Sequence, residues 1–397
     1  SRASILTGQY MHHHQVVDNQ RPVPKGTVFF PQHLQEAGYQ TAFIGKWHMG
    51  HDDDAPQPGF HHWASFKGQG NYVKNNFNIN GQHRQIDGYV TDVITDMAVD
   101  WIKANRDKPF LAVVHHKAVH AMFIPAERHR DLYADVKIVL PPSSLDTPEN
   151  YFRRPRWVRE QRDSWHGIND AYYKEISLDQ FIRDYCRALQ AADDSVGRLM
   201  DALEALGLRE STLIVFTSDN GFLFGEHGLI DKRCMYEESI RIPMIMSCPQ
   251  LFKGGQVLDP MVLNIDVAPT FVEAAGLPVP GEMQGRSFLK LPNDPNMPWR
   301  KSFLYEYFWE VDYPETPTVL GVRTDRYKYM EYQGVWDANE LYDLQNDPQE
   351  LHNRISTSRR KVVTPDPEYA KVYDEMRKEL HDLTARLGCR DWPTWKK

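Results

Sequence analysis

The stretch Thr212-Leu213-Ile214-Val215-Phe216-Thr217-Ser218-Asp219-Asn220-Gly221 places a short apolar run directly before a polar turn. A continuous run of this kind, rich in β-branched and aromatic residues, predicts a buried central strand. The run follows a long segment with apolar residues at helical spacing that ends near Gly207: Phe181, Tyr185, Leu189, Ala192, Val196, Leu199 and Leu203. A helix that leads into a buried strand is the repeating unit of a sheet covered by helices.

The same order of helix and strand recurs on both sides of this stretch. Residues 90–101 carry apolar side chains at helical spacing and precede the apolar run 110–114, and residues 243–246 indicate a further strand. This alternation predicts an α/β fold with a mostly parallel sheet between helices. Ligands of such sheets bind at the carboxyl ends of the strands.

The pattern changes after Pro292. Short strands are predicted at 303–305, 319–323 and 327–330, and a charged amphipathic helix at 367–386. We therefore expect an α/β domain over residues 1–292 and a C-terminal subdomain over residues 293–397, with a small antiparallel sheet plus helix. The irregular stretch 138–180 is expected to be a surface insertion that forms part of the substrate wall.

Composition excludes several classes of protein. The 46 basic and 54 acidic residues give a net charge of -8, which argues against a nucleic-acid-coating surface. No apolar run approaches the ~20 residues that a membrane-spanning helix needs. The 4 cysteines are too few and too scattered for a disulfide framework. An anionic substrate would therefore be held by a local cluster of cations.

Polar residues follow three of the predicted strands. Asp219 and Asn220 offer hard oxygen ligands for Ca²⁺ or Mg²⁺, although Asp-Asn-Gly is also the composition of an ordinary turn. Lys46 and His48 follow the apolar residues 41–44. Two residues apart in an extended chain, their side chains point the same way, so one supplies fixed charge while the other can move a proton. The alternative is a surface lysine beside a packed histidine.

The third polar segment is His115-His116-Lys117-Ala118-Val119-His120, which follows the apolar run 110–114. Four titratable nitrogen side chains within six residues at a strand end indicate a functional site. A metal cluster is one interpretation, but no carboxylate or thiol ligand is close in the sequence.

The opening octet Ser1-Arg2-Ala3-Ser4-Ile5-Leu6-Thr7-Gly8 resembles the second half of the signature of the type I sulfatases. Residues 45–50 resemble the Gly-Lys-Trp-His element of the same family, and residues 217–243 resemble its Asp-Asn segment with a downstream lysine. The motifs stand in the family's order over nearly the whole chain. The resemblance implies an alkaline-phosphatase-like fold and a Ca²⁺ ion, with Mg²⁺ less favoured.

Site residues follow from the resemblance position by position. Asp219 and Asn220 match metal ligands, and Lys46 and Lys232 match the lysines that bind sulfate. The remaining matches are Arg2 beside the nucleophile, His48 on the formylglycine diol, His120 as general acid, and Lys117 and His116 lining the same pocket.

The resemblance also places the nucleophile, a Cys or Ser oxidised to formylglycine, three residues upstream of Ser1. Two further aspartate ligands would lie on a first strand, also upstream. The expectation is therefore that residues 1–397 lack this strand and are inactive alone. A formylglycine-generating enzyme is the implied maturation partner, and the family expectation for compartment is periplasmic, secreted or lysosomal.

The implied activity is hydrolysis of sulfate esters of a sugar or polysaccharide. Residues 117–120, 305–307 and 323–325 look most like N-acetylglucosamine-6-sulfatases. Two alternatives stay open: a phosphonate monoester or phosphodiester hydrolase of the same superfamily, and a non-catalytic glycan-binding relative. A strong preference for phosphodiesters would favour the first, and an unsuitable residue at the nucleophile position would favour the second.

Overall fold

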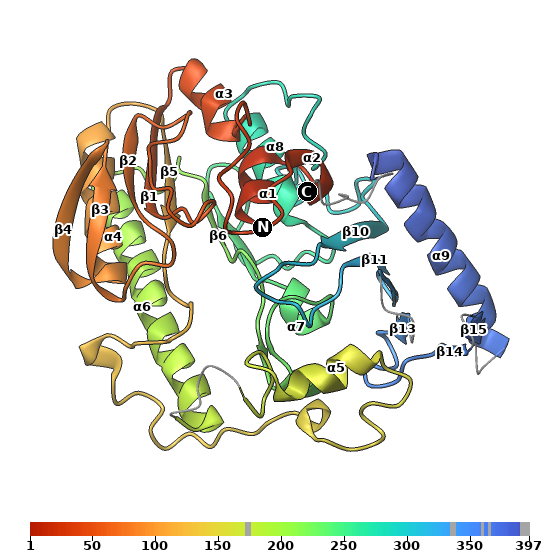
Figure 1. Ribbon diagram of the computed structural model, residues 1–397. Helices are drawn as coiled ribbons and strands as arrows, with labels where there is room; N and C mark the ends of the chain where they lie inside the picture. The colour runs from red at the N-terminus through yellow and green to blue at the C-terminus, as the bar shows by residue number, and fades with distance from the viewer. Residues whose placement is uncertain (171–175, 334–338, 359–360, 364–366, 390–397) are drawn as a thin grey trace.

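The computed structural model describes residues 1–170, 176–333, 339–358, 361–363 and 367–389 (Figure 1). Its helices are α1 (Arg2–Thr7), α2 (Met11–His14), α3 (Phe30–Glu36), α4 (Val90–Asn105), α5 (Arg156–Glu160), α6 (Leu178–Ala205), α7 (Glu237–Ile240), α8 (Val267–Ala274) and α9 (Pro367–Leu387). Single 3₁₀ turns are η1 (Glu127–His129), η2 (Pro142–Ser144), η3 (Gln161–Asp163), η4 (Glu226–Gly228) and η5 (Asn264–Asp266).

A five-stranded mixed sheet forms the centre of the N-terminal part. Its order is β4-β3-β2-β1-β5, with β1 (Gln40–Lys46), β2 (His62–Phe66), β3 (Val73–Ile79), β4 (Gln82–Tyr89) and β5 (Phe110–His115). Strand β1 runs parallel to β2 and β5, whereas β2, β3 and β4 pair antiparallel. The short connections between β2, β3 and β4 allow only hairpins, which is why this edge departs from the parallel pairing predicted from the sequence.

Helices cover both faces of this sheet. Ala42 and Ile44 of β1 pack in a buried cluster with residues of α4 and α6, whereas Phe43 packs on the other face with residues of α3 and α8. Successive side chains of a strand point to opposite faces, so the apolar run Ala42-Phe43-Ile44 of β1 serves both layers. The α/β architecture expected from the sequence is therefore confirmed, and Figure 1 shows α4 and α6 on one side of the sheet.

Strand β6 (Ile214–Thr217) does not join the five-stranded sheet. It pairs antiparallel with β9 (Met244–Ser247), and β7 (Leu223–Phe224) pairs with β8 (Ile230–Asp231). The prediction of a central strand at 212–216 is wrong for the described chain, because a cavity of ≈ 2300 Å³ lies between β5 and β6 and both strands line it. Each of these two strands has a single pairing partner among the described residues.

The C-terminal part is an antiparallel sheet backed by a helix, as the sequence predicts. The sheet order is β10-β11-β12-β13, with β10 (Ser302–Tyr307), β11 (Val319–Thr324), β12 (Tyr327–Tyr332) and β13 (Glu340–Asp343). Met376, Leu380 and Leu383 of α9 pack on its apolar face. A separate hairpin joins β14 (Ser356–Ser358) to β15 (Lys361–Val363). The domain boundary at 292/293 stays a prediction.

The predicted insertion at 138–180 contains the short elements η2, α5 and η3 and the first residues of α6, joined by irregular chain. Its residues 171–175 lie outside the described ranges. Within the described ranges, none of the helices combines the length and the apolar character that crossing a membrane requires.

Candidate active site

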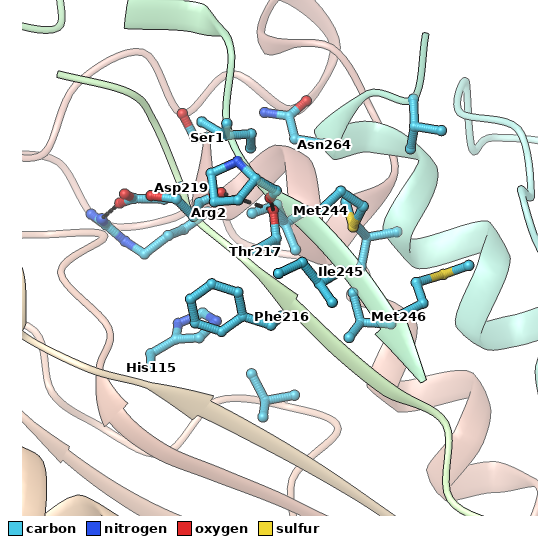
Figure 2. Close-up of a pocket in the computed structure, with 18 of the residues that line it drawn as sticks. Ser1, Arg2, His115, Phe216, Thr217, Asp219, Met244, Ile245, Met246 and Asn264 are labelled. Atoms are coloured by element: carbon cyan, nitrogen blue, oxygen red, sulfur yellow. Dashed lines mark hydrogen bonds and ion pairs between the residues drawn. The ribbon is translucent and has the colours of Figure 1, made fainter. Parts of the chain in front are cut away.

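Most residues predicted for the site converge at one end of the molecule's strands. Lys46 is the last residue of β1, Lys117 and His120 follow β5, and Asp219 follows β6. Arg2 opens α1, and Figure 2 shows its side chain pointing toward Asp219. The carboxyl ends of β1 and β5 meet because the two strands are parallel neighbours.

Gly45 lets the ends of β1 and β5 meet closely. It pairs with His115 in register, and a Cβ added to it would stand only 1.9 Å from the His115 carbonyl oxygen. Its φ of 121° also lies in a region that favours glycine. Because residue 45 is a glycine, the end of β1 that carries Lys46 can pack directly against the His115 backbone.

Arg2 connects the end of β1 to the end of β6. Its Nη1 donates to Asp219 Oδ2 at 2.7 Å, its Nε donates to the Trp47 carbonyl at 2.9 Å, and its Nη2 donates to the His48 carbonyl at 2.8 Å. A guanidinium presents several donors in a rigid plane, so this one side chain can bind two chain segments, residues 47–48 and Asp219. Arg2 thus orients Asp219 as well as adding charge.

Positive charge accumulates around Asp219. Burial lowers the pKa of Lys46 well below its usual range, and the nearby Arg2 and Lys232 lower it further. Burial alone would raise the pKa of Asp219, but Arg2, Lys46 and Lys232 hold it well below its usual range. One carboxylate therefore faces several cations, and the surplus positive charge suits an anionic ligand.

The histidines in this field are neutral without a ligand. Burial, together with Lys46 and Arg2, lowers the pKa of His48 to about 3. Burial, with Lys46 and Lys232 nearby, lowers the pKa of His120 far below its ordinary value. His120 Nδ1 lies 2.7 Å from the Ala121 carbonyl oxygen, which requires Nδ1 to carry the proton. Its Nε2 is therefore the atom that exchanges a proton with a ligand.

His115 belongs to this group although it was not predicted as a site residue. Burial lowers its pKa to about 4, and the charge of Arg2 lowers it further while that of Asp219 opposes the shift. His116 instead turns to α6, where its Nε2 lies 2.9 Å from Ser195 Oγ. The structure therefore does not bring His116 to the cation cluster, by which we mean Arg2, Lys46 and Lys232 around Asp219. The alternation of side chains along β5 was the available signal, since residues 115 and 116 must face opposite ways.

Lys232 is held by a carboxylate that was also not predicted. Its Nζ lies 3.3 Å from Asp231 Oδ1, and Asp231 also pairs with Arg233. Asp231 adopts a φ of 107°, a backbone conformation that residues other than glycine rarely take. This conformation lets one buried carboxylate contact the two basic residues that follow it in the chain.

Asp219 and Asn220 supply the right kind of donor for a hard cation but not enough donors. A Ca²⁺ ion takes 6–8 oxygen ligands. Among the described residues, the groupings of three or more His, Cys, Asp and Glu side chains compatible with a metal are His12 with Glu306 and Cys389, and His227 with Glu238 and Glu350. Neither includes Asp219, so these two residues form part of a calcium site only if other oxygens join them.

Lys117 provides a test of the cation cluster by pH. Burial lowers its pKa to about 8, so its ammonium is present below that pH and lost as the pH rises. We expect the KM for an anionic ester to rise above pH 8, by about tenfold per pH unit at most. Lys117→Arg, which keeps its charge, should remove that rise, and Lys117→Met should show a high KM throughout. An unchanged KM profile in Lys117→Arg would exclude Lys117 as its source.

The family model described as Sulfatase matches residues 1–277. The chain belongs to the sulfatase family. It is accordingly a sulfuric ester hydrolase with the alkaline-phosphatase-like fold expected from its sequence motifs. A second model, described as N-sulphoglucosamine sulphohydrolase, C-terminal, matches residues 225–386 of this sulfatase.

Individual relatives agree with this assignment. The sulfatase is 34% identical to the N-acetylglucosamine-6-O-sulfatase of Bacteroides thetaiotaomicron, over 98% of this chain and 78% of that protein. A solved structure of an enzyme in complex with its substrate D-glucosamine-2-N,6-O-disulfate superposes with a TM-score of 0.86 at 30% identity, covering 100% of this chain and 89% of the other. A phosphonate monoester hydrolase from Silicibacter pomeroyi shares the fold, with a TM-score of 0.76 at 20% identity over 97% of this chain and 85% of the other.

Proposed function

We propose that this sulfatase removes 6-O-sulfate from glucosamine-type residues of a sulfated carbohydrate. The observation that carries the proposal is the convergence of Arg2, Lys46 and Lys232 on one partly exposed carboxylate, that of Asp219, with His120 beside them. The relatives named above support the choice of sugar, since one is an N-acetylglucosamine-6-O-sulfatase and another holds a 6-O-sulfated glucosamine.

The cation cluster binds the sulfate group and stabilises its developing charge. Lys46 and Lys232 neighbour the same carboxylate, so a sulfate placed between them replaces the missing negative charge. Preorganised cations of this kind lose little free energy to reorganisation during the reaction. The bound anion also favours the protonated form of His120, since it offsets the three lysines, Lys46, Lys232 and Lys117, that lower its pKa.

His120 then supplies the proton that the leaving sugar oxygen needs. Its Nδ1–H is committed to the Ala121 carbonyl, so the proton is held and released at Nε2. When the S–O ester bond breaks, the electron pair stays on the sugar oxygen, and the proton from Nε2 converts it to a hydroxyl. A sugar alkoxide is a poor leaving group, so this proton is most important for carbohydrate esters.

We infer that Asp219 and Asn220 contribute to a Ca²⁺ site. When bound, the ion would add positive charge next to the sulfate oxygens. The remaining ligands would be further oxygens from carboxylates, carbonyls or waters. In that arrangement Arg2 keeps Asp219 ionised and oriented for the metal.

We further propose that an extended strand occupies the cavity between β5 and β6 and carries two carboxylate ligands and the formylglycine nucleophile. Both strands expose an edge to a cavity of ≈ 2300 Å³, and a strand adds to such an edge by backbone hydrogen bonding. The buried His48 Nδ1 and His115 Nδ1 lack a hydrogen-bond partner in the described part of the chain, which suits a polar group arriving there. A formylglycine-generating enzyme would install the nucleophile.

A panel of position-defined sulfated sugars tests the proposed activity. Protein expressed from its complete reading frame should act on 6-O-sulfated N-acetylglucosamine with kcat/KM at least about 10²-fold higher than on a phosphodiester. Activity confined to aryl sulfates would contradict the carbohydrate substrate, and a faster phosphodiester reaction would favour the alternative hydrolase.

A further inference from the structure

Three side chains from distant parts of the chain, which we call the His12 cluster, meet inside the molecule. His12 lies on α2, Glu306 on β10, and Cys389 just after the end of α9, and Figure 1 shows α2 and β10 at the same end of α9. His12 Nδ1 lies 2.5 Å from Glu306 Oε1, and Cys389 Sγ lies 3.1 Å from the same oxygen. The side chains of His12 and Glu306 are only 7% and 2% exposed, and Cys389 is buried. A nitrogen, an oxygen and a sulfur atom therefore converge on one point.

These three kinds of atom are the ligands that zinc uses in proteins. A Zn²⁺ ion binds histidine nitrogen, carboxylate oxygen and cysteine sulfur at about 2.0–2.3 Å, usually in a tetrahedron. Such a tetrahedron holds nitrogen and oxygen about 3.4 Å apart, and sulfur and oxygen about 3.6 Å apart. The two distances to Glu306 Oε1, 2.5 Å and 3.1 Å, would each grow by less than about 1 Å to admit the ion.

Backbone groups already orient two of the three side chains as a metal requires. His12 Nε2 lies 3.0 Å from the Leu387 carbonyl oxygen, so Nε2 carries a proton and Nδ1 is the nitrogen that can bind a metal. The His12 backbone N–H donates to Glu306 Oε2 at 3.3 Å, which turns Oε1 toward the cluster. Metal-bound histidines commonly donate their other N–H to a carbonyl, and metal-bound carboxylates are themselves hydrogen-bonded. The outer contacts of a zinc site are therefore present.

The other metal-compatible grouping described above differs, because fixed cations already pair with its members. Lys328 Nζ lies 2.7 Å from Glu350 Oε1, and Arg154 Nη1 lies 2.6 Å from His227 Nδ1. Two such cations next to the ligand atoms would repel a metal ion. In the His12 cluster the carboxylate instead pairs with the histidine itself, whose proton a metal can replace.

We propose that the His12 cluster is a Zn²⁺ site, with its three side chains as ligands and water as the fourth. On binding, the Cys389 thiol gives its proton to solvent and its sulfur coordinates as the thiolate. Glu306 is among the residues that line the large cavity, which gives the ion and the water a route to the cluster. The ion would join the segment that follows Arg2 to the C-terminal sheet and helix, and so stabilise the fold. The proposal does not depend on the sugar or the reaction proposed above.

Titrations of the full-length protein with Zn²⁺ and Co²⁺, after removal of metals with a chelator, test the proposal. Wild-type protein should bind one Zn²⁺ at the cluster with a rise in Tm, and Co²⁺ should give the charge-transfer absorption of a thiolate ligand. Cys389→Ser and Glu306→Gln nearly keep the size of each side chain. Each should lower the affinity for Zn²⁺ at least about 10²-fold, and Cys389→Ser should abolish the thiolate absorption.

Three control variants separate this site from other places where a metal can bind. Cys186→Ser removes a partly exposed cysteine of α6, and His13→Ala removes an exposed histidine next to the cluster. Asp219→Asn changes the proposed calcium site. All three should bind Zn²⁺ as the wild type does.

Wild-type protein that shows no thiolate absorption with Co²⁺ would overturn the proposal, and this outcome needs no variant to fold. Unchanged Zn²⁺ affinity in folded Cys389→Ser and Glu306→Gln would overturn it as well. Loss of binding in His13→Ala alone would show that zinc binds only at the surface.

Discussion

Asp219→Asn is expected to lower kcat for sulfate ester hydrolysis about 10³-fold, because it removes the charge that pairs with Arg2 and that the proposed Ca²⁺ ion would contact. The change should also remove the stabilisation by calcium, measured as the rise in Tm on adding Ca²⁺. Asparagine has nearly the same volume as aspartate, so packing around the site is preserved. The loss would therefore report the missing charge.

Asp107→Asn is the matched control for this substitution. Asp107 carries a side chain that is 89% exposed and pairs only loosely with Arg106, at 3.7 Å. Its replacement should change neither activity nor the calcium-dependent Tm. If Asp219→Asn folds, keeps its activity and still gains stability with Ca²⁺, Asp219 is not a metal ligand.

His120→Ala should slow sugar sulfates about 10²–10⁴-fold, the usual contribution of a general acid. The effect on aryl sulfates should be much smaller, because a phenolate leaves without being protonated. The comparison of kcat on a sugar sulfate and on a nitrophenyl sulfate measures this difference. Binding of the sulfate group is common to both substrates and cancels in the ratio.

The exposed histidine His13 offers a control of the same residue type, outside the site on α2. His13→Ala should leave both rates unchanged. Equal losses on both substrates in His120→Ala would point to a role in binding or positioning and would remove the assignment as general acid. A normal thermal unfolding profile for His120→Ala is needed beside either outcome.

Local sequence was enough to predict most elements. Helix α4 and strand β5 lie where the apolar spacing at 90–101 and the apolar run at 110–114 place them. The antiparallel pairing of the C-terminal strands also matches the prediction, since short strands with tight turns allow little else. Hydrophobic periodicity is a local property, so it can be read without knowledge of the fold.

Pairing between distant strands was less predictable. The strands β3 and β4 carry many polar side chains, and Val73 in β3 is itself 54% exposed, so neither shows the apolar run of a central strand. The run at 212–216 does show one, yet β6 pairs only with β9 among the described residues. An apolar run indicates burial, but it does not say which strand lies beside it.

The family, the α/β class and the residue types of the site could be predicted from the sequence, because motifs at strand ends are local and can be recognised in short stretches. Tertiary structure alone decided which of these side chains meet. Arg2 and Asp219 are 217 positions apart in the chain and join in one ion pair. His115 and His116 are adjacent and separate to opposite sides of a strand. The energy of a charge interaction depends on the distance between the two groups in space, and only the folded structure gives that distance.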